Sequence, residues 1–281
     1  MTPEVSVVLP CYRSAKLAVE SVYRLEAFFR DVGMSWETIV VDDGGGDFPA
    51  AQAWEPFLNA RLVRLPANRG KGAAVAAGMR AATGRVCVFT DVDLPYDLEL
   101  IPVIVEYIRD YGFHLVIGDR TLPDSLYLSD LSFQRRLASE LFSQFVGRLV
   151  TGGFFDTQCG LKGMRGDIAH ELFRLQRLER FSFDVELVYL ALKHKLDIKR
   201  VPVQLRNNET STIRLLRDAS QAVLDVFRIK WYQLRGRYRS ELLENAVRAD
   251  FARVLESTRP NARRMAVANS DGAHAREVFT E

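Results

Sequence analysis

Short apolar runs alternate with helix-like patterns over the first 120 residues, and no other feature constrains the fold as strongly. Runs rich in Val and Ile predict strands, and apolar residues at helical spacing predict the helices between them. The predicted strands cover residues 5–9, 37–41, 61–65, 86–90 and 113–117. Strands that alternate with helices form a mostly parallel sheet with helices on both faces. The sequence therefore predicts an α/β fold.

The second half of the chain is more helical, and its last part changes composition. The expected elements are helices over 132–150, 183–193 and 215–239, a loop over 155–164 and a strand over 198–205. Beyond about residue 257 the chain is rich in Ala, Arg, Asn and Ser, which is typical of a mobile tail. We expect a catalytic domain over 1–212, an amphipathic helical segment over 213–256 and a flexible tail over 257–281.

Composition excludes several classes of protein. Hydrophobic residues make up 48% of the chain, enough for a sizeable core. The formal net charge of +2 gives no sign of a nucleic-acid partner. The three cysteines lack metal-type spacing and suit a reducing compartment. Since we find neither a signal-peptide pattern nor 18 uncharged apolar residues in a row, we expect a cytoplasmic protein without a membrane span.

Three polar clusters follow predicted strands, at residues 10–12, 42–44 and 91–93. Ligands of open α/β sheets bind beyond the carboxyl ends of the strands. Two carboxylates two residues apart on extended backbone point to the same side, so Asp91 and Asp93 together can hold Mg²⁺ or Mn²⁺. Asp-x-Asp is by itself a weak signal, because most instances are solvated loops. Its place beside the other clusters favours a metal site.

Two further segments carry candidate ligand-binding groups. A carboxylate of Asp42-Asp43 can accept a hydrogen bond from a base or a ribose, although an ordinary turn explains Asp and Gly equally well. Residues 68–72 lead into a predicted helix, whose start favours anions, and Arg69 and Lys71 add positive charge. Lys71 is followed by Gly72, not Ser or Thr, so this segment is not a Walker P-loop. The alternative is that residues 68–72 simply begin a helix and bind no ligand.

Taken together, these motifs resemble a known family. The sequence reads LPCY at 9–12, VVDDG at 40–44, NRGKGAAVAAGM at 68–79, TDVDL at 90–94 and IGDR at 117–120. This series resembles the inverting family 2 glycosyltransferases with the GT-A fold. DTQCGLKGMR at 156–165 and FSFDVELVYLA at 181–191 are similar to the polyprenyl-phosphate subgroup, which includes dolichol-phosphate mannose and glucose synthases. The resemblance covers roughly residues 4–235.

The resemblance implies how the donor is bound. Pro10 and Tyr12 would flank the base of a nucleotide sugar, and Asp42 or Asp43 would contact the base or ribose. Asp91 would lie near the sugar, the ribose and the diphosphate. The chain departs from the family at residues 13–14, which are Arg-Ser instead of Asn-Glu, and at 44–45, which are Gly-Gly instead of Gly-Ser. These departures leave the sugar and the base open between a GDP- and a UDP-sugar.

The resemblance also implies the metal ligand and an acceptor site. Asp93 would be the principal metal carboxylate, and Arg120 would lie near the phosphates. Arg135, Ser139 and Arg214 fall where relatives bind the acceptor phosphate. A polyprenyl phosphate is already anionic, so it needs cations and no general base, and guanidinium groups pair well with phosphate.

Three acidic residues have alternative roles. Asp156 would be a general base if the acceptor were a hydroxyl group instead. Asp184 and Glu186 cannot share one helix face, and we expect one of them to order the site by pairing with Lys162 or Arg165.

Residues 213–239 offer a route to the membrane. They place Leu216, Val223, Val226, Phe227 and Trp231 near one helix face and carry seven Lys or Arg against two Asp. An interfacial helix at the inner face of a membrane and a helix packed on the catalytic domain both fit this pattern.

Three functions remain open from the sequence alone. The first is transfer of mannose or glucose from a nucleotide sugar to polyprenyl phosphate. The second is a soluble family 2 enzyme that uses a hydroxyl acceptor, and the third is a catalytically silent nucleotide-binding partner protein.

Overall fold

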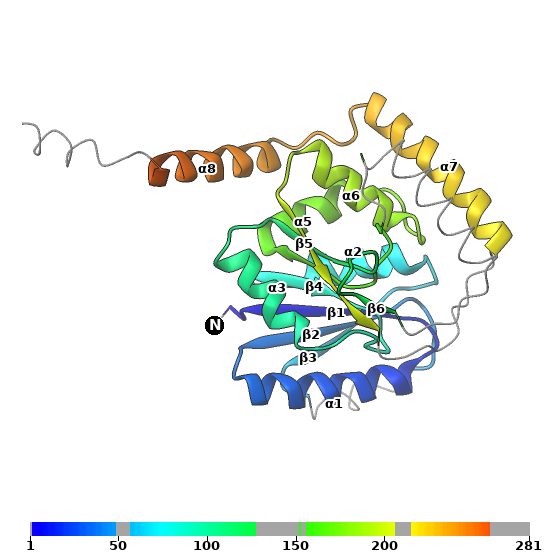
Figure 1. Ribbon diagram of the computed structural model, residues 1–281. Helices are drawn as coiled ribbons and strands as arrows, with labels where there is room; N and C mark the ends of the chain where they lie inside the picture. The colour runs from blue at the N-terminus through cyan, green and yellow to red at the C-terminus, as the bar shows by residue number, and fades with distance from the viewer. Residues whose placement is uncertain (1, 49–56, 128–151, 153–155, 206–214, 259–281) are drawn as a thin grey trace, which may run out of the picture. The chain divides into compact units, whose positions relative to one another are not determined.

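A seven-stranded sheet forms the centre of the protein, as seen in the computed structural model (Figure 1). The structure describes residues 2–48, 57–127, 152, 156–205 and 215–258. The strands are β1 (Val5–Cys11), β2 (Trp36–Asp42), β3 (Ala60–Arg64), β4 (Val86–Phe89), β5 (Leu115–Asp119), β7 (Lys162–Arg165) and β8 (Ile198–Pro202). Their order in the sheet is β3-β2-β1-β4-β7-β5-β8. The predicted α/β fold is confirmed.

Strand β7 is the one antiparallel member among the described strands of this sheet, where it pairs with β4 on one side and β5 on the other. The prediction of a loop through Met164 was therefore wrong at its end. The four residues of β7 include Lys162 and Arg165, so they lack the apolar run that identifies a buried strand. Lys162 is nevertheless fully buried, because its ammonium group pairs with Asp184.

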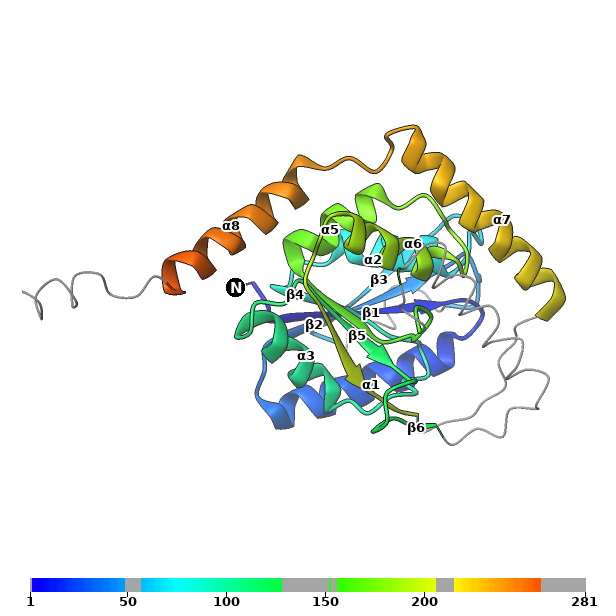
Figure 2. The ribbon, with the colours of Figure 1, turned by 45° about the horizontal axis from the view of Figure 1, so that its top comes forward.

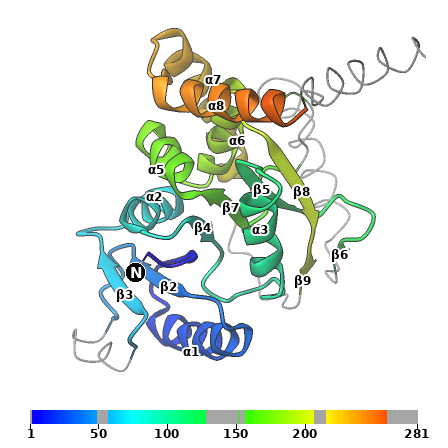
Figure 3. The ribbon, with the colours of Figure 1, turned by 90° about the vertical axis from the view of Figure 1, so that its left-hand side faces the viewer.

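Helices cover both faces of the sheet (Figures 2 and 3). Helices α1 (Ala15–Val32) and α3 (Leu100–Arg109) pack on one face, where their apolar side chains share one core cluster with alternate residues of β1. Helices α2 (Lys71–Ala81), α5 (Gly166–Leu175) and α6 (Phe183–Lys193) cover the other face. There, Phe89 of β4 contacts the rings of Phe173 and Phe183.

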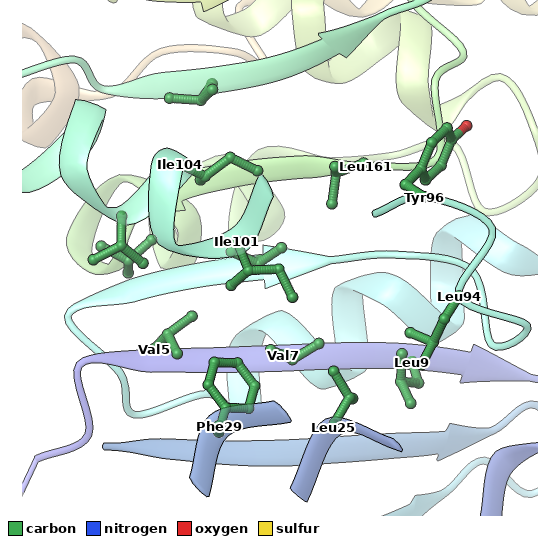
Figure 4. Packing of buried hydrophobic residues seen from close by; sticks show 14 of the residues in the cluster. Val5, Val7, Leu9, Leu25, Phe29, Leu94, Tyr96, Ile101, Ile104 and Leu161 are labelled. Carbon is green, nitrogen blue, oxygen red and sulfur yellow. The ribbon is translucent and has the colours of Figure 1, made fainter. Parts of the chain in front are cut away.

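The core beneath α1 and α3 is shown in Figure 4. Val7 and Leu9 of β1 lie against Leu25 and Phe29 of α1, and all four are fully buried. Truncation of such a side chain to Ala typically costs about 2–5 kcal/mol of unfolding free energy. This packing holds β1 in place, and with it the strand end that leads to Tyr12.

The remaining described elements are β6 (Leu126–Tyr127), β9 (Gln204–Leu205), α7 (Leu215–Leu234) and α8 (Glu241–Thr258). β6 and β9 form a separate two-stranded parallel sheet. The predicted strand over 198–205 is thus two strands, and the predicted helix over 215–239 ends at Leu234, shortly before Gly236 with its positive φ of 67°.

By its contacts, the chain divides into residues Met1–Leu243 and Glu244–Glu281. The second unit is described only over 244–258, within α8. A search of the described helices finds none long and apolar enough to cross a bilayer.

Candidate active site

The carboxyl ends of β1, β2 and β4 lie at one edge of the sheet. β1 lies between β2 and β4 and is parallel to both, with Cys11 opposite Asp42 and Val8 opposite Phe89. The backbone amide of Asp43 donates to the carbonyl of Cys11 at 2.8 Å, and that of Thr90 donates to Val8 at 3.1 Å. The structure therefore brings the three predicted polar clusters to the same edge.

The first two clusters offer an exposed aromatic ring, Tyr12, and a buried carboxylate, Asp42. Pro10 is buried, whereas 43% of Tyr12 is exposed. Asp42 is buried, and its Oδ1 accepts a hydrogen bond from the backbone amide of Gly45 at 2.7 Å. Asp42 thus shapes the turn that follows β2, while the Tyr12 ring is accessible to a ligand.

Asp43 ties the end of β2 to the beginning of α2. Its Oδ1 accepts from the backbone amide of Arg69 and its Oδ2 from that of Gly70, both at 2.8 Å. Removing a buried acceptor of this kind leaves amide groups without partners, which costs about 1–3 kcal/mol. Asp43 therefore positions the segment that carries Lys71.

Lys71 is the first residue of α2 and pairs with Asp91, its Nζ lying 2.5 Å from Oδ1. Burial alone would lower the pKa of Lys71, but attraction to Asp91 and Asp184 outweighs it and holds the pKa above its ordinary value. The ammonium group is therefore charged at neutral pH. It adds positive charge at the start of α2, the end of a helix that favours anions.

The Asp91–Asp93 segment differs from the extended backbone that the sequence argument assumed. The amide of Leu94 donates to the carbonyl of Asp91 at 3.0 Å, and residues 92–93 form a turn. The premise of extended backbone was therefore wrong, and the two carboxylates are related by a turn. The turn provides hydrogen bonding for the backbone between the end of β4 and Pro95. The alternation of side chains along a strand does not predict such a turn.

The donor set at this turn still fits a hard divalent ion. Asp91 and Asp93 are half-buried and offer carboxylate oxygens, the ligands that Mg²⁺ and Mn²⁺ prefer. Within the described ranges, no three side chains of His, Cys, Asp or Glu converge as a metal cage. Mg²⁺ commonly binds to one or two carboxylates and takes its other ligands from substrate phosphates and water.

A loop before β7 closes against Asp91. A Cβ placed on Gly160 would lie 2.2 Å from Asp91 Oδ2, so any side chain there would collide with the carboxylate. The amide of Gly160 also donates to the hydroxyl of Tyr96 at 3.2 Å. Sequence analysis gave neither Gly160 nor Tyr96 a role, although Gly160 lies inside the 156–165 motif.

Arg120 follows β5 and is held by Asp156 from the same loop. The backbone amide and Nε of Arg120 donate to Oδ2 at 2.8 and 2.9 Å, and Nη2 donates to Oδ1 at 2.7 Å. Burial would raise the pKa of Asp156, but the hydrogen bonds and charge of Arg120 hold it below its ordinary value. Asp156 is therefore ionised and orients the guanidinium group.

The buried Lys162–Asp184 ion pair anchors the other end of the loop to α6. This contact confirms the predicted pairing of one of the two α6 acids with Lys162. Burial raises the pKa of Asp184, against the opposing charges of Lys162 and Lys71. Arg165, the alternative partner, pairs with Asp167 instead.

The second α6 acid, Glu186, serves a different segment. It accepts hydrogen bonds from the backbone amides of Arg177 and Leu178 and from the hydroxyl of Tyr238. Tyr238 is fully buried and was not identified from the sequence. Its distance of 52 residues from Glu186 leaves no local pattern that pairs them.

Three predicted acceptor residues, Arg135, Ser139 and Arg214, lie outside the described residues. The described site thus combines an exposed ring, two candidate metal carboxylates and two held cations, Lys71 and Arg120. Such a set can bind a diphosphate with its metal and can hold a second anion close by.

Comparison with known proteins identifies the family of the chain. The model of the glycosyl transferase family 2 matches residues 6–173. A dolichyl-phosphate beta-glucosyltransferase of Dictyostelium discoideum is 32% identical over 82% of this chain and 75% of its own length. The human protein of the same name is 29% identical over 85% and 79%. An undecaprenyl-phosphate 4-deoxy-4-formamido-L-arabinose transferase of Pectobacterium atrosepticum is 28% identical over 75% and 64%.

Solved structures support the fold. Glucosyl-3-phosphoglycerate synthase of Mycobacterium tuberculosis, crystallised with Mn²⁺, UDP and phosphoglyceric acid, superimposes with a TM-score of 0.57 at 19% identity, over 84% of this chain and 78% of that one. Mannosyl-3-phosphoglycerate synthase of Rubrobacter xylanophilus gives 0.55 at 18% identity, over 85% and 77%. The fold is GT-A, and the chain belongs to glycosyl transferase family 2, with polyprenyl-phosphate sugar transferases among its relatives.

Proposed function

We propose that the protein transfers a hexose from a nucleoside diphosphate sugar to a polyprenyl phosphate, with inversion at the anomeric carbon. One observation carries the proposal: at the sheet edge, the Asp91–Asp93 turn lies beside Lys71, while Asp156 fixes the guanidinium group of Arg120. Negative groups are thus available for a metal, and positive groups for phosphate. The names of the relatives favour glucose as the sugar, while GDP-mannose remains the alternative donor to UDP-glucose.

On the donor side, Pro10, Tyr12 and Asp42 would surround the nucleoside, with Asp43 acting through the Lys71 segment. Asp91 and Asp93 would hold Mg²⁺ or Mn²⁺, which would neutralise the departing diphosphate. The M. tuberculosis neighbour was crystallised with Mn²⁺ and UDP, which supports this assignment. The resemblance makes Asp93 the principal ligand.

On the acceptor side, Arg120 would hold the lipid phosphate, together with Arg135, Ser139 and Arg214. A phosphate acceptor is already anionic, so no residue needs to remove its proton. Asp156 accepts three hydrogen bonds from Arg120, and its lowered pKa makes it a weak base. This favours a phosphate acceptor over a hydroxyl acceptor, the second candidate function.

We also propose that residues 1–212 carry catalysis and that the segment from 213 attaches the protein peripherally to the cytoplasmic face of a membrane. Val226 and Ile229 of α7 are buried, whereas Leu224, Phe227 and Trp231 are exposed and line a shallow apolar hollow with Arg228. Basic residues accompany this surface, at positions 228, 230, 235, 237 and 239. Apolar side chains beside basic ones suit an anionic bilayer surface.

Liposome flotation tests the attachment. Full-length protein should float with vesicles in which about a third of the phospholipid is anionic. High salt should weaken this binding because it screens the charges. Phe227→Ser together with Trp231→Ser should remove most of this binding. Tyr111→Ser, which changes an exposed aromatic residue just after α3, is the control and should bind normally. Equal flotation of both variants would contradict the proposal.

A donor screen tests the activity itself. UDP-glucose, GDP-mannose and other nucleotide sugars are incubated with a short polyprenyl phosphate and Mg²⁺ or Mn²⁺, and the lipid product is extracted. We expect one hexose donor to label the lipid and NMR to show inverted anomeric configuration. Sugar transfer that survives Asp93→Ala unchanged would contradict the metal role. A protein that transfers no sugar to any acceptor would instead support the catalytically silent class.

A further inference from the structure

Four charged side chains alternate in sign beside the candidate metal site. Lys71 pairs with Asp91, its Nζ lying 2.5 Å from Oδ1, and the charge of Asp184 also attracts it. Asp184 in turn pairs with the fully buried Lys162. These two acids and two bases sum to zero charge. The group is therefore balanced before any divalent ion is added.

Both carboxylate oxygens of Asp91 have close neighbours. Oδ1 is taken by Lys71, and Oδ2 lies against the backbone of Gly160, where a Cβ would be only 2.2 Å away. Only 20% of the Lys71 side chain is exposed, so water screens its charge poorly. A divalent ion that approached Asp91 would meet this ammonium group and the positive end of α2.

We infer that Lys71 acts as an internal counter-ion for Asp91 and makes divalent-metal binding conditional on the nucleoside diphosphate. The inference rests on the proposed function, which supplies the diphosphate. A diphosphate brings negative charge that attracts both cations, so Lys71 and the metal no longer compete for one carboxylate. Linkage then requires the metal and the diphosphate to raise each other's affinity by the same factor.

Mn²⁺ binding to the full-length protein tests this without turnover. Free Mn²⁺ is followed by electron paramagnetic resonance during titration, alone and with saturating UDP, with GDP in a parallel series. In the wild type we expect the nucleotide to tighten Mn²⁺ binding by about tenfold or more. In Lys71→Met, Mn²⁺ alone should bind several-fold more tightly, and the effect of UDP should shrink. Lys71→Arg keeps the charge and should keep the wild-type pattern.

Two results would overturn the inference. One is equal Mn²⁺ affinity of the wild type with and without nucleotide, a measurement that holds even if Lys71→Met does not fold. The other is a folded Lys71→Met protein with unchanged affinity for Mn²⁺ alone and weaker UDP binding, which would make Lys71 a phosphate ligand only. Intact coupling of Mn²⁺ and UDP without transfer to polyprenyl phosphate would contradict the proposed acceptor and support this inference.

Discussion

Asp156 binds Arg120 through three hydrogen bonds, two from the guanidinium group and one from the backbone amide of the same residue. The carboxylate of Asp156 is buried, whereas a third of the Arg120 side chain is exposed. The pair joins the end of β5 to the 156–161 loop, and it holds the guanidinium group of Arg120 in one orientation.

The first prediction concerns the strength of this pair. Asp156→Asn removes the charge that compensates Arg120 but keeps the shape. Removal of one partner of a buried ion pair costs about 3–5 kcal/mol, and partial exposure of Arg120 places the expected loss at about 3 kcal/mol. Urea unfolding measures it. A loss below about 0.5 kcal/mol, the level of a surface pair, would show that the pair is not structural.

The same pair predicts a pH dependence. The pKa of Asp156 is lower in the folded protein than its unfolded value of about 3.9. Its contribution to stability is therefore fully present above about pH 4 and is lost as the pH falls through the folded pKa. The difference in unfolding free energy between wild type and Asp156→Asn should be constant from pH 7 to 5 and shrink below 4. A difference that grew on acidification would contradict this sign.

Gly160 predicts a loss of activity that does not depend on stability. Gly160→Ala would press a methyl group against Asp91 Oδ2 and displace the carboxylate. A misplaced group of this kind typically costs about a hundredfold in rate, so we expect kcat to fall 10- to 100-fold. Gly33→Ala, at the positive-φ end of α1 where an added Cβ would meet no atom within 4 Å, is the control: it should lower Tm and spare kcat. A normal kcat in Gly160→Ala would show that the close approach of Gly160 is not needed to position Asp91.

Asp43 predicts an effect on the donor. Asp43→Ala leaves the amides of Arg69 and Gly70 without their acceptor, and the Lys71 segment loses its anchor. We expect KM for the nucleotide sugar to rise about tenfold, equivalent to about 1.4 kcal/mol. Leu58→Ala, which truncates a side chain that is 93% exposed before the start of β3, is the control. An unchanged KM would mean that the segment keeps its position without Asp43.

Tyr238 predicts an effect on stability alone. Tyr238→Phe removes the hydroxyl that donates to the buried carboxylate of Glu186. A hydrogen bond to a charged group contributes about 1.5–3 kcal/mol, so unfolding in urea should become easier by about 2 kcal/mol. Sugar transfer by the folded variant should match the wild type, because Tyr238 lies in the connection between α7 and α8 and is not one of the candidate site residues. A transfer defect without a stability loss would contradict this assignment.

Much of the fold follows from local pattern. The apolar runs at 5–9 and 37–41 lie inside β1 and β2, and the helix predicted over 183–193 is α6 with the same bounds. Periodicity and composition identify such elements because apolar residues fill most of their buried positions. β7 was missed for the opposite reason: Lys162 is charged, and its burial depends on Asp184, 22 residues further along the chain.

The candidate site likewise has features that sequence patterns predict and contacts that they do not. That Asp42, Asp43 and Asp91 share an edge follows from strand ends in a parallel sheet. The partners of these residues do not follow from it. Asp43 holds backbone amides, Asp91 lies in a turn, and Gly160 packs against it from about 70 residues away. Such contacts depend on how distant segments meet, which no spacing within one segment encodes.

The central claim is that the acceptor is a lipid phosphate. It is tested most directly by one matched comparison: the same nucleotide sugar and metal with a short polyprenyl phosphate or with the corresponding polyprenol. We predict sugar transfer to the phosphate and none to the alcohol, because a guanidinium group such as that of Arg120 favours an anion, and Asp156, which Arg120 engages, has a lowered pKa and is a weak base. Transfer to the polyprenol at a comparable rate, lost in Asp156→Asn, would contradict it.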